Sequence, residues 1–133
     1  MSMKVLMAEP DRRFAEHATS YLESHAHLVV HETQVDRALA QAMHWKPDLI
    51  IAAAELAGSG LLEALGNLRP RPAILLTGWM DRFDRVWRAW QEGGDELLMK
   101  PIFQVQELHA AILTAMENAA AGTRCGGRLA ASA

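Results

Sequence analysis

Cysteine, positive charge and long apolar runs are all scarce in this chain, and each scarcity argues against a class of protein. The one cysteine, Cys125, has no partner for an internal disulfide, so nothing in the 133 residues requires an oxidising compartment. The longest apolar run, Leu49 to Ala54, is far too short to span a membrane, and the start of the chain lacks the apolar stretch of a secretory signal. We therefore expect a cytoplasmic protein without a membrane segment.

The charge balance also limits the partners of the chain. Thirteen Lys and Arg residues against 16 Asp and Glu residues give a formal net charge of -3. Such a chain has no broad positive field for nucleic acid or for an anionic membrane surface. Half of the residues are hydrophobic, which is enough for one packed core. We expect no nucleic-acid partner, one domain over residues 1–120, and a flexible tail or linker stub over residues 121–133.

Short apolar runs alternate with amphipathic segments along the chain. The runs at 4–8, 28–31, 49–53, 73–77 and 97–99 predict strands, because turn residues or helical patterns bound each of them. Helices are expected between them, the first capped by Asp11, the second capped by Thr33, and the fourth running from Asp81 to Glu92. Five strand-helix units predict a three-layer, flavodoxin-like (βα)5 fold of the α/β class, a doubly wound parallel sheet with strand order 2-1-3-4-5.

Ligands of such a sheet bind beyond the carboxyl ends of the strands. The residues expected at these ends are Glu9, Pro10, Ala53, Thr77 and Lys100. They form an unusual set, because a carboxylate, a hydroxyl and an ammonium stand beside two side chains that have no reactive group.

Four segments that carry these residues resemble the receiver domains of bacterial two-component response regulators. The segments are 4–11, 47–51, 73–78 and 94–102, and the Lys100-Pro101 pair in the last of them is the most specific. The resemblance extends over roughly residues 4–120. It implies a signalling domain of a phosphorelay, in which an aspartate after the third strand accepts phosphate. An acidic pair after the first strand holds Mg²⁺ with it, and a Thr or Ser and a Lys contact the phosphoryl group.

The chain departs from this family at the residues that would perform the chemistry. Five residues after Asp48, the acceptor position falls on Ala53, and the second member of the acidic pair falls on Pro10. Phosphoryl transfer depends on positioning and on a hard cation with oxygen ligands. We therefore expect no catalytic residue, no metal, no cofactor and very weak or absent Mg²⁺ binding. The degenerate phosphorylation site consists of Glu9, Pro10, Ala53, Glu55, Thr77, Lys100 and Pro101.

Lys100 needs a new partner in a site that has lost its aspartate. A buried ammonium without a carboxylate is destabilising by several kcal/mol, so the sequence favours an ion pair with Glu9 or, failing that, with Glu55. A different alignment would put Glu55 at the acceptor position, where a fixed carboxylate imitates a phosphate. That alignment disturbs the match at Pro47-Asp48, and we favour Ala53.

Histidines are the other candidates for metal chemistry. His17, His25, His27 and His31 lie close together in the sequence, and His27 and His31 fall on one face of a strand. No cysteine or carboxylate stands at a convincing ligand spacing, so exposed histidines without a metal are the favoured interpretation.

The segment from Trp79 to Trp90 has the most unusual composition of the chain. Phe83, Val86, Trp87 and Trp90 recur at helical spacing, which predicts a stripe facing the core, and Trp79 is expected in the loop after Thr77. Tryptophan and arginine are enriched at interface hot spots. We predict a partner face formed by Trp79, Arg82, Arg85, Arg88 and Leu97.

These observations predict a phosphorylation-independent adaptor, a pseudo-receiver that is not an enzyme and acts by protein–protein interaction. The expected partners are a histidine kinase or an output protein, and a homodimer through the fourth helix, fifth strand and fifth helix would resemble the family. Two alternatives stay open. One is a phosphoacceptor that uses a displaced carboxylate, Glu55 or Asp11; the other is a regulatory module that binds a small anion at Thr77 and Lys100.

Overall fold

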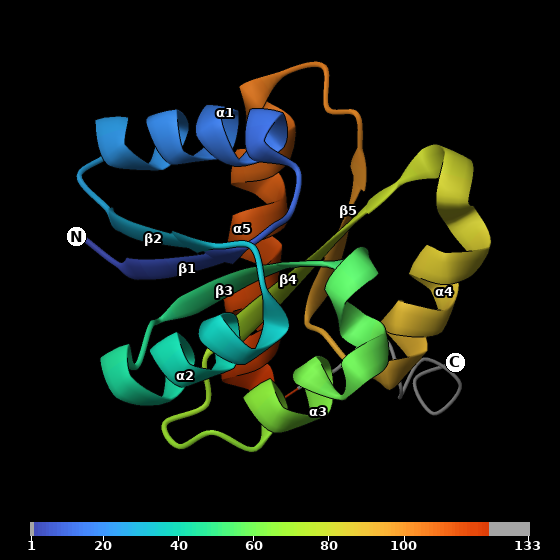
Figure 1. The fold of residues 1–133 in the computed structure, drawn as a ribbon. Helices are drawn as coiled ribbons and strands as arrows, with labels where there is room; N and C mark the ends of the chain where they lie inside the picture. The colour runs from blue at the N-terminus through green and yellow to red at the C-terminus, as the bar shows by residue number, and fades with distance from the viewer. Residues whose placement is uncertain (1, 123–133) are drawn as a thin grey trace.

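A computed structural model describes residues 2–122 of the chain (Figure 1). The described residues form β1 (Lys4–Ala8), α1 (Arg12–Ser24), β2 (Leu28–Glu32), α2 (Val35–Trp45), β3 (Leu49–Ala53), the 3-10 helix η1 (Ala54–Ser59), α3 (Leu61–Gly66), β4 (Ala73–Trp79), the 3-10 helix η2 (Met80–Arg82), α4 (Phe83–Glu92), β5 (Glu96–Lys100) and α5 (Val105–Ala121). The tail expected over residues 121–133 lies outside the described part, apart from the last residue of α5 and Gly122.

The five strands form one parallel sheet with the order β2-β1-β3-β4-β5, so the predicted fold and strand order are confirmed. The pairing register puts Ala53 opposite Thr77 and Trp79 opposite Lys100. Because all strands run in the same direction, their carboxyl ends lie along one edge of the sheet. This edge brings the candidate site residues together.

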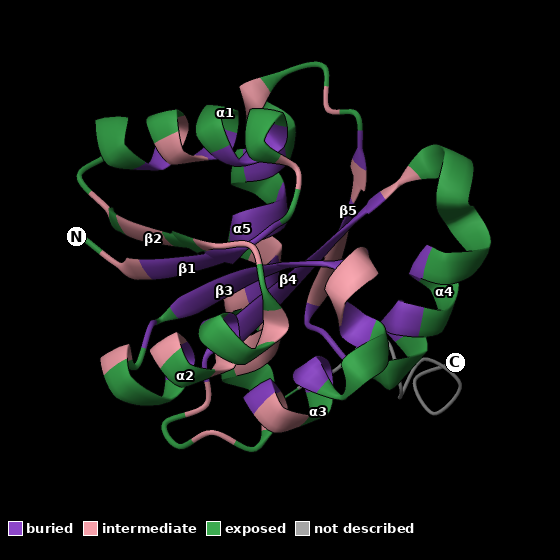
Figure 2. Ribbon diagram, in the orientation of Figure 1, coloured by how far each residue is buried: buried purple, intermediate pink, exposed green. Residues whose placement is uncertain are grey.

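Helices cover both faces of the sheet (Figure 1). One core contains α1 and α5 packed on residues such as Val5 and Met7, and the other contains α2, α3 and α4 packed on residues such as Leu6 and Ala8. Successive strand residues point to opposite faces, which explains this division. The central strand β3 is buried along its whole length, because both of its faces are covered (Figure 2). Within the described residues, no helix has the length and apolar character needed to cross a membrane.

The capping residue predicted for the first helix is found in the structure, and the one predicted for the second helix is not. Asp11 is the N-cap of α1, where its side chain accepts hydrogen bonds from the backbone N–H groups of Arg13 and Phe14. The prediction that Thr33 caps the next helix is wrong. Strand β2 continues to Glu32, and the cap position of α2 is held by Gln34, which makes no side-chain capping bond.

The fourth strand begins and the helix after it ends where predicted, but the end of the strand and the start of the helix differ from the prediction. Strand β4 extends to Trp79, whose pairing with Lys100 places it in the sheet and not in a loop. Helix α4 starts at Phe83 and not at Asp81, because the residues between form the single turn η2. Trp79 is thereby held next to the carboxyl end of β5.

Candidate functional site

Four residues at the carboxyl edge of the sheet are fully buried although three of them are polar. Glu9 directly follows β1, Thr77 lies in β4, and Lys100 ends β5, and none of these three has measurable exposure. Ala53 ends β3 and is equally buried. Pro10, the other sequence candidate beside Glu9, is exposed. A polar group that is removed from water in this way requires a hydrogen-bonding partner.

The carboxylate of Glu9 meets this requirement for the whole site. Its Oε1 accepts a hydrogen bond from Lys100 Nζ at 2.9 Å and a second from Thr77 Oγ1 at 3.1 Å. Its Oε2 accepts a third, from the backbone N–H of Asp11 at 3.1 Å. The predicted ion pair between Lys100 and Glu9 is confirmed. Glu9 therefore connects three strands and the start of α1 through one side chain.

Two aromatic rings complete the surroundings of Lys100. Its ammonium lies 5.0 Å from the ring centroid of Phe14 and 4.9 Å from that of Trp79. Cations are attracted to the faces of aromatic rings, and more strongly where water is excluded. Phe14 was missed as a site residue by the sequence reasoning, which treated it only as a core position of the first helix. Phe14 could have been predicted as a site residue from its position, because it lies in the first turn of α1, directly after the carboxyl end of β1. The peptide between Lys100 and Pro101 is cis.

Burial raises the pKa of the Glu9 carboxyl above its ordinary value, because the charged form loses its hydration. The ammonium of Lys100 and the N–H of Asp11 act in the opposite direction, and the negative charge of Glu55 adds to the increase. Desolvation is the largest of these effects. Enclosing the ion pair therefore has a cost, because the Glu9 carboxyl binds its proton more tightly than it would in water.

Two features of this arrangement bear on phosphoryl chemistry and on Mg²⁺ binding. The methyl group of Ala53 offers no oxygen to phosphorylate, and both oxygens of Glu9 already accept hydrogen bonds. Among the residues that the structure describes, no cluster of three His, Cys, Asp or Glu side chains could hold a metal ion. The donor set that a hard cation needs does not come together at this edge.

Glu55, the alternative partner of Lys100, lies in the first turn of η1 and is half-buried. Over residues 2–122 it forms no ion pair with Lys100, whose ammonium pairs with Glu9. Its charge is nevertheless felt at Glu9, as the pKa of that group indicates. Glu55 therefore stands at the border of the site.

The histidines do not gather into a site. His27 accepts a hydrogen bond from the backbone N–H of Met3 at 3.0 Å, and burial lowers the pKa of its imidazole. His31 makes a hydrogen bond of 2.7 Å to the backbone carbonyl of Glu9, and His25 packs against the ring of Tyr21. The contacts of His27 and His31 tie β2 and the residue before it to the two ends of β1, whereas the contact of His25 lies within the end of α1.

The residues of the predicted partner face are not equally accessible. Arg82, Arg85 and Arg88 are exposed, whereas Trp79 and Leu97 are half-buried. Trp79 covers Lys100, and Leu97 packs against the core beneath α4. The accessible part of this face is therefore the arginine series.

The prediction of a core-facing stripe on the fourth helix is half wrong. Val86 and Trp90 are buried, but Phe83 and Trp87 are 56% and 40% exposed. Their rings stack on each other with centroids 6.4 Å apart. The reason is a close approach beneath the helix, since Gly78 of β4 packs directly on Val86 and so fixes which side of α4 faces the sheet.

A second buried carboxylate, Asp95, escaped the sequence reasoning as a stabilising group. Its oxygens accept two hydrogen bonds from Arg71, at 3.0 and 3.1 Å, and one from the backbone N–H of Ile74 at 2.8 Å. The backbone carbonyl of Asp95 accepts a further bond from Asn118. Asp95 lies before β5, at the end of the sheet opposite to Glu9, so its role is to join β4, β5 and α5.

Comparison with known proteins identifies structures with a similar fold but no similar sequence. No family model matches the sequence, and no curated protein sequence matches it. Among solved structures, NtrX from Brucella abortus in complex with ADP is similar with a TM-score of 0.77 and 20% identity over 88% of this chain, which spans 26% of NtrX.

Two further structures are similar over most of their own length. The signal receiver domain of a putative Luxo repressor protein from Vibrio parahaemolyticus has a TM-score of 0.72 and 18% identity, with 92% of this chain and 96% of that one covered. The chemotaxis response regulator CheY4 of Vibrio cholerae has a TM-score of 0.72 and 19% identity, with 86% and 99% covered. The chain therefore has the fold of a signal receiver domain.

Proposed function

We propose that the chain is a pseudo-receiver, a regulatory domain of the response-regulator type that takes part in signal transduction without being phosphorylated. The observation that supports this most is the shared acceptor of Thr77 and Lys100. These residues correspond to the phosphoryl-contacting pair of receiver domains, and both donate to Oε1 of Glu9. An internal carboxylate thus occupies the groups that would bind an anion, and Ala53 supplies no acceptor beside them.

On this proposal the domain is not an enzyme, needs no cofactor and acts through its surface. A histidine kinase or an output protein is the partner that the fold suggests. The exposed stacked pair of Phe83 and Trp87 supports a contact role for α4, since large aromatic side chains in water are typical of interaction sites. Self-association through α4, β5 and α5 is a second mode that the same residues would serve.

The proposal is tested by exposing the full chain to Mg²⁺ and then to a phosphate mimic, beryllofluoride, while the tryptophan fluorescence is recorded. Trp79 lies next to Lys100 and would report a bound ligand. In parallel, the chain is incubated with acetyl phosphate and its intact mass is measured. We expect no saturable fluorescence change and no phosphorylated species.

The opposite result would identify a displaced acceptor. If the chain gains a phosphoryl group, the variants Glu55→Gln and Asp11→Asn show which carboxylate received it, and the proposal falls. A fluorescence change with an anion alone, without Mg²⁺, would instead favour the small-anion module and would also overturn the proposal.

A further inference from the structure

Two histidines tie the segment of β2 to the two ends of β1, and they do so with opposite hydrogen-bonding roles. His31 Nε2 lies 2.7 Å from the backbone carbonyl of Glu9, and because a carbonyl only accepts, this nitrogen carries a proton. His27 Nδ1 lies 3.0 Å from the backbone nitrogen of Met3, and because an N–H group only donates, Nδ1 carries none. The bond at the start of β1 therefore requires a neutral imidazole, and the bond at its end does not.

The bond to His27 extends the ladder between β1 and β2 by one residue. The paired residues of the two strands begin at Lys4 and Leu28. Directly before them, the carbonyl of Met3 accepts from the N–H of Leu28 at 2.9 Å, while the N–H of Met3 donates to the ring of His27. Both backbone groups of Met3 are thus bound to the start of β2, and one of the two bonds is made by a side chain that titrates near neutral pH.

The surroundings of His27 favour its neutral form. The half-buried ring lines a pocket of about 190 Å³ with Met3 and with residues of α1 and α5. The other titratable side chains that line this pocket are Tyr21, His25 and His109, and none of the described residues lining it is a carboxylate that would stabilise an imidazolium. Burial lowers the pKa of His27, and the charges of His25 and of the amino terminus act in the same direction.

The pocket neighbours interact with one another and do not supply a counter-charge. The hydroxyl of Tyr21 is bound to Nδ1 of His109 at 2.5 Å, which joins α1 to α5. Nδ1 of His25 lies 3.0 Å from the backbone carbonyl of Tyr21, so it donates a proton to that oxygen. A positive charge on His27 would therefore meet a second imidazole and a phenol.

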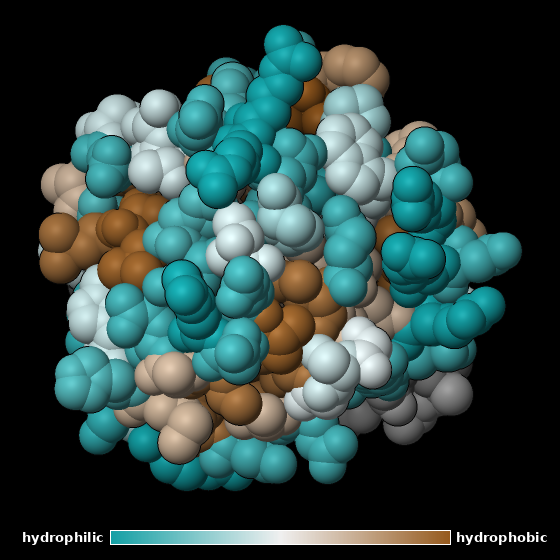
Figure 3. Space-filling view, in the orientation of Figure 1, coloured by the Kyte–Doolittle hydropathy of each residue, from teal (hydrophilic) through white to brown (hydrophobic). Residues whose placement is uncertain are grey.

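Met3 covers apolar surface at this end of the sheet. Figure 3 shows apolar side chains at the left of the molecule, where Figure 1 places the start of β1 beside β2. Leu28 is 59% exposed at the start of β2, and Met3 packs against the core that contains α1 and α5. Because Met3 is one wall of the pocket, together with residues such as Leu22 and Ile112, its displacement would open the pocket to water.

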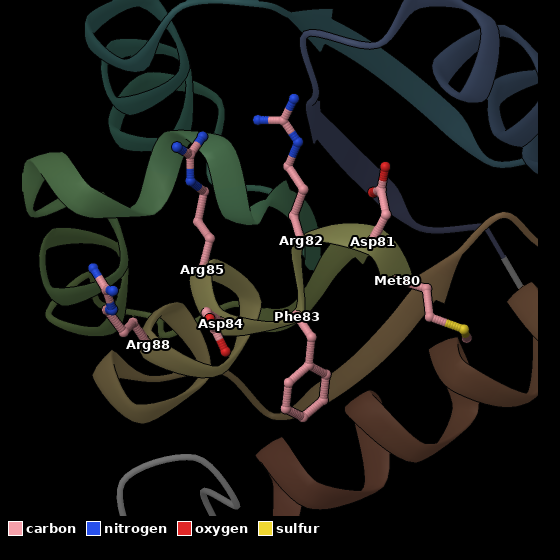
Figure 4. A pocket seen from close by; sticks show the side chains of 7 residues that line it. All are labelled: Met80, Asp81, Arg82, Phe83, Asp84, Arg85 and Arg88. Atoms are coloured by element: carbon pink, nitrogen blue, oxygen red, sulfur yellow. The ribbon is translucent and has the colours of Figure 1, made fainter.

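The hollow beside α4 differs from this pocket in its response to pH. It has a volume of about 500 Å³ and is lined by side chains of both charges, Arg82, Arg85 and Arg88 with Asp81 and Asp84 (Figure 4). No histidine is among the described residues that line it. Arginine and aspartate ordinarily keep their charges between about pH 5 and pH 7, whereas histidine does not. A response to mild acid is therefore expected at the start of β1 and not beside α4.

We infer that His27 is a pH-sensitive switch that holds the start of β1 while its imidazole is neutral and releases it when the ring takes up a proton from solvent. Protonation places an N–H group at Nδ1, where it faces the N–H of Met3, and two donors cannot bond to each other. The half-buried amide of Met3 then lacks its acceptor, which is unfavourable. His31 donates in both states, so the end of β1 and the site around Glu9 stay in place. This inference goes beyond the proposed function and does not depend on it.

The effect of this switch on stability has a defined sign. Because the pKa of His27 in the folded state lies below its ordinary value of 6.5, the unfolded chain binds more protons in the interval between the two values. The contribution of the neutral ring is complete above pH 6.5 and is lost as the pH falls through the folded-state pKa. The raised pKa of Glu9 acts on global stability in the opposite sense. A local measurement therefore separates the two groups better than global unfolding does.

The test measures amide hydrogen exchange of the full chain by NMR at about pH 5 and about pH 7, with each rate corrected for the intrinsic rate at that pH. The amide of Leu28 reports the start of β1, since it donates to Met3. The amide of Glu9, which donates to the carbonyl of Glu32 at 3.0 Å, reports the other end.

Three variants accompany the unmodified chain. His27→Asn keeps an acceptor oxygen near the place of Nδ1 but does not titrate, and His27→Ala has no acceptor at all. His31→Gln is the matched control, because it removes a titrating ring from the other end of β1 and keeps a donor there.

We expect the protection of the Leu28 amide to be about tenfold lower at the lower pH in the unmodified chain and in His31→Gln, since a hydrogen bond is lost and two donors face each other. Its protection should be high at both pH values in His27→Asn and low at both in His27→Ala.

Unchanged protection of Leu28 in the unmodified chain, or the same decrease in His27→Asn, would overturn the inference. An equal decrease at Glu9 in the unmodified chain would overturn it too, because the whole strand would then be opening. Each of these results leaves the phosphorylation-free proposal intact, since that proposal is decided by phosphoryl labelling.

Discussion

The pair formed by Glu9 and Lys100 permits a quantitative prediction through a double-mutant cycle. In Glu9→Gln, the ammonium of Lys100 stays fully buried and loses its charged acceptor at 2.9 Å. Removing one member of a buried ion pair destabilises a protein by about 3 to 5 kcal/mol. Lys100→Met keeps most of the buried apolar volume, and Glu9 can then take up a proton. We expect that change to lower the free energy of unfolding by about 1 to 3 kcal/mol.

The double variant distinguishes an enclosed pair from an exposed one. Glu9→Gln with Lys100→Met removes both charges, while the single amide oxygen can still accept from Thr77 or from the backbone N–H of Asp11, which donate to different oxygens of Glu9. Its stability should therefore lie within about 2 kcal/mol of the unmodified protein. The coupling energy between the two changes is then at least about 2 kcal/mol.

The assay is urea unfolding followed by far-ultraviolet circular dichroism, with the same slope required for all four proteins. Additive effects of the two substitutions, or a loss of less than about 0.5 kcal/mol in Glu9→Gln, would contradict the reasoning, because values of that size are typical of surface ion pairs.

Three further predictions follow from other contacts. Since burial raises the pKa of Glu9, its protonation favours the folded state; this contribution is complete below pH 4.5 and is lost as the pH rises through the folded pKa. In urea titrations, the free energy of unfolding of the unmodified protein relative to Glu9→Gln should therefore fall as the pH rises. A difference that does not change with pH would refute this prediction. In Gly78→Ala the new Cβ would lie 2.2 Å from a methyl of Val86, so thermal unfolding should show a loss of about 1 to 3 kcal/mol that adding Val86→Ala reduces. If the double variant is no more stable than Gly78→Ala, overpacking is not the cause. Asp95→Ala should destabilise by about 3 kcal/mol in urea, and more than Arg71→Ala, because the carboxylate is fully buried and the arginine is not; equal losses would contradict this.

The ion pair could be predicted because few alternatives were open to Lys100. The strand order follows from the alternation of elements, and it puts the ends of β1, β4 and β5 along one edge. Glu9 is the carboxylate that directly follows a central strand there, and a buried ammonium requires such a partner. The alternation of strands and helices, together with the need of a buried ammonium for a carboxylate, was sufficient to predict this ion pair.

The orientation of α4 could not be predicted in the same way. Phe83 with Trp87 and Val86 with Trp90 are both pairs at a spacing of four, so two neighbouring stripes compete for the core. The choice depends on Gly78, which lets β4 approach Val86 closely. A contact between separate elements decided it, and periodicity within the helix contains no information about such a contact.

The buried Asp95 was missed for a related reason. Its partner Arg71 lies 24 residues away and reaches it only because β4 and β5 are adjacent in the sheet. The sequence shows an aspartate after two glycines, a pattern that also suits an exposed turn.

The enclosure of Lys100 has a consequence for how such a domain can carry information. Its ammonium is held by a carboxylate after β1 and by rings from α1 and β4, so no rearrangement of one loop frees it. Backbone amides around it, that of Asp11 included, should exchange with deuterium only in rare, near-global openings. If the domain acts as a pseudo-receiver, as proposed, then its signal would be set by its amount and by competition among its partners, and not by a change of shape around Lys100.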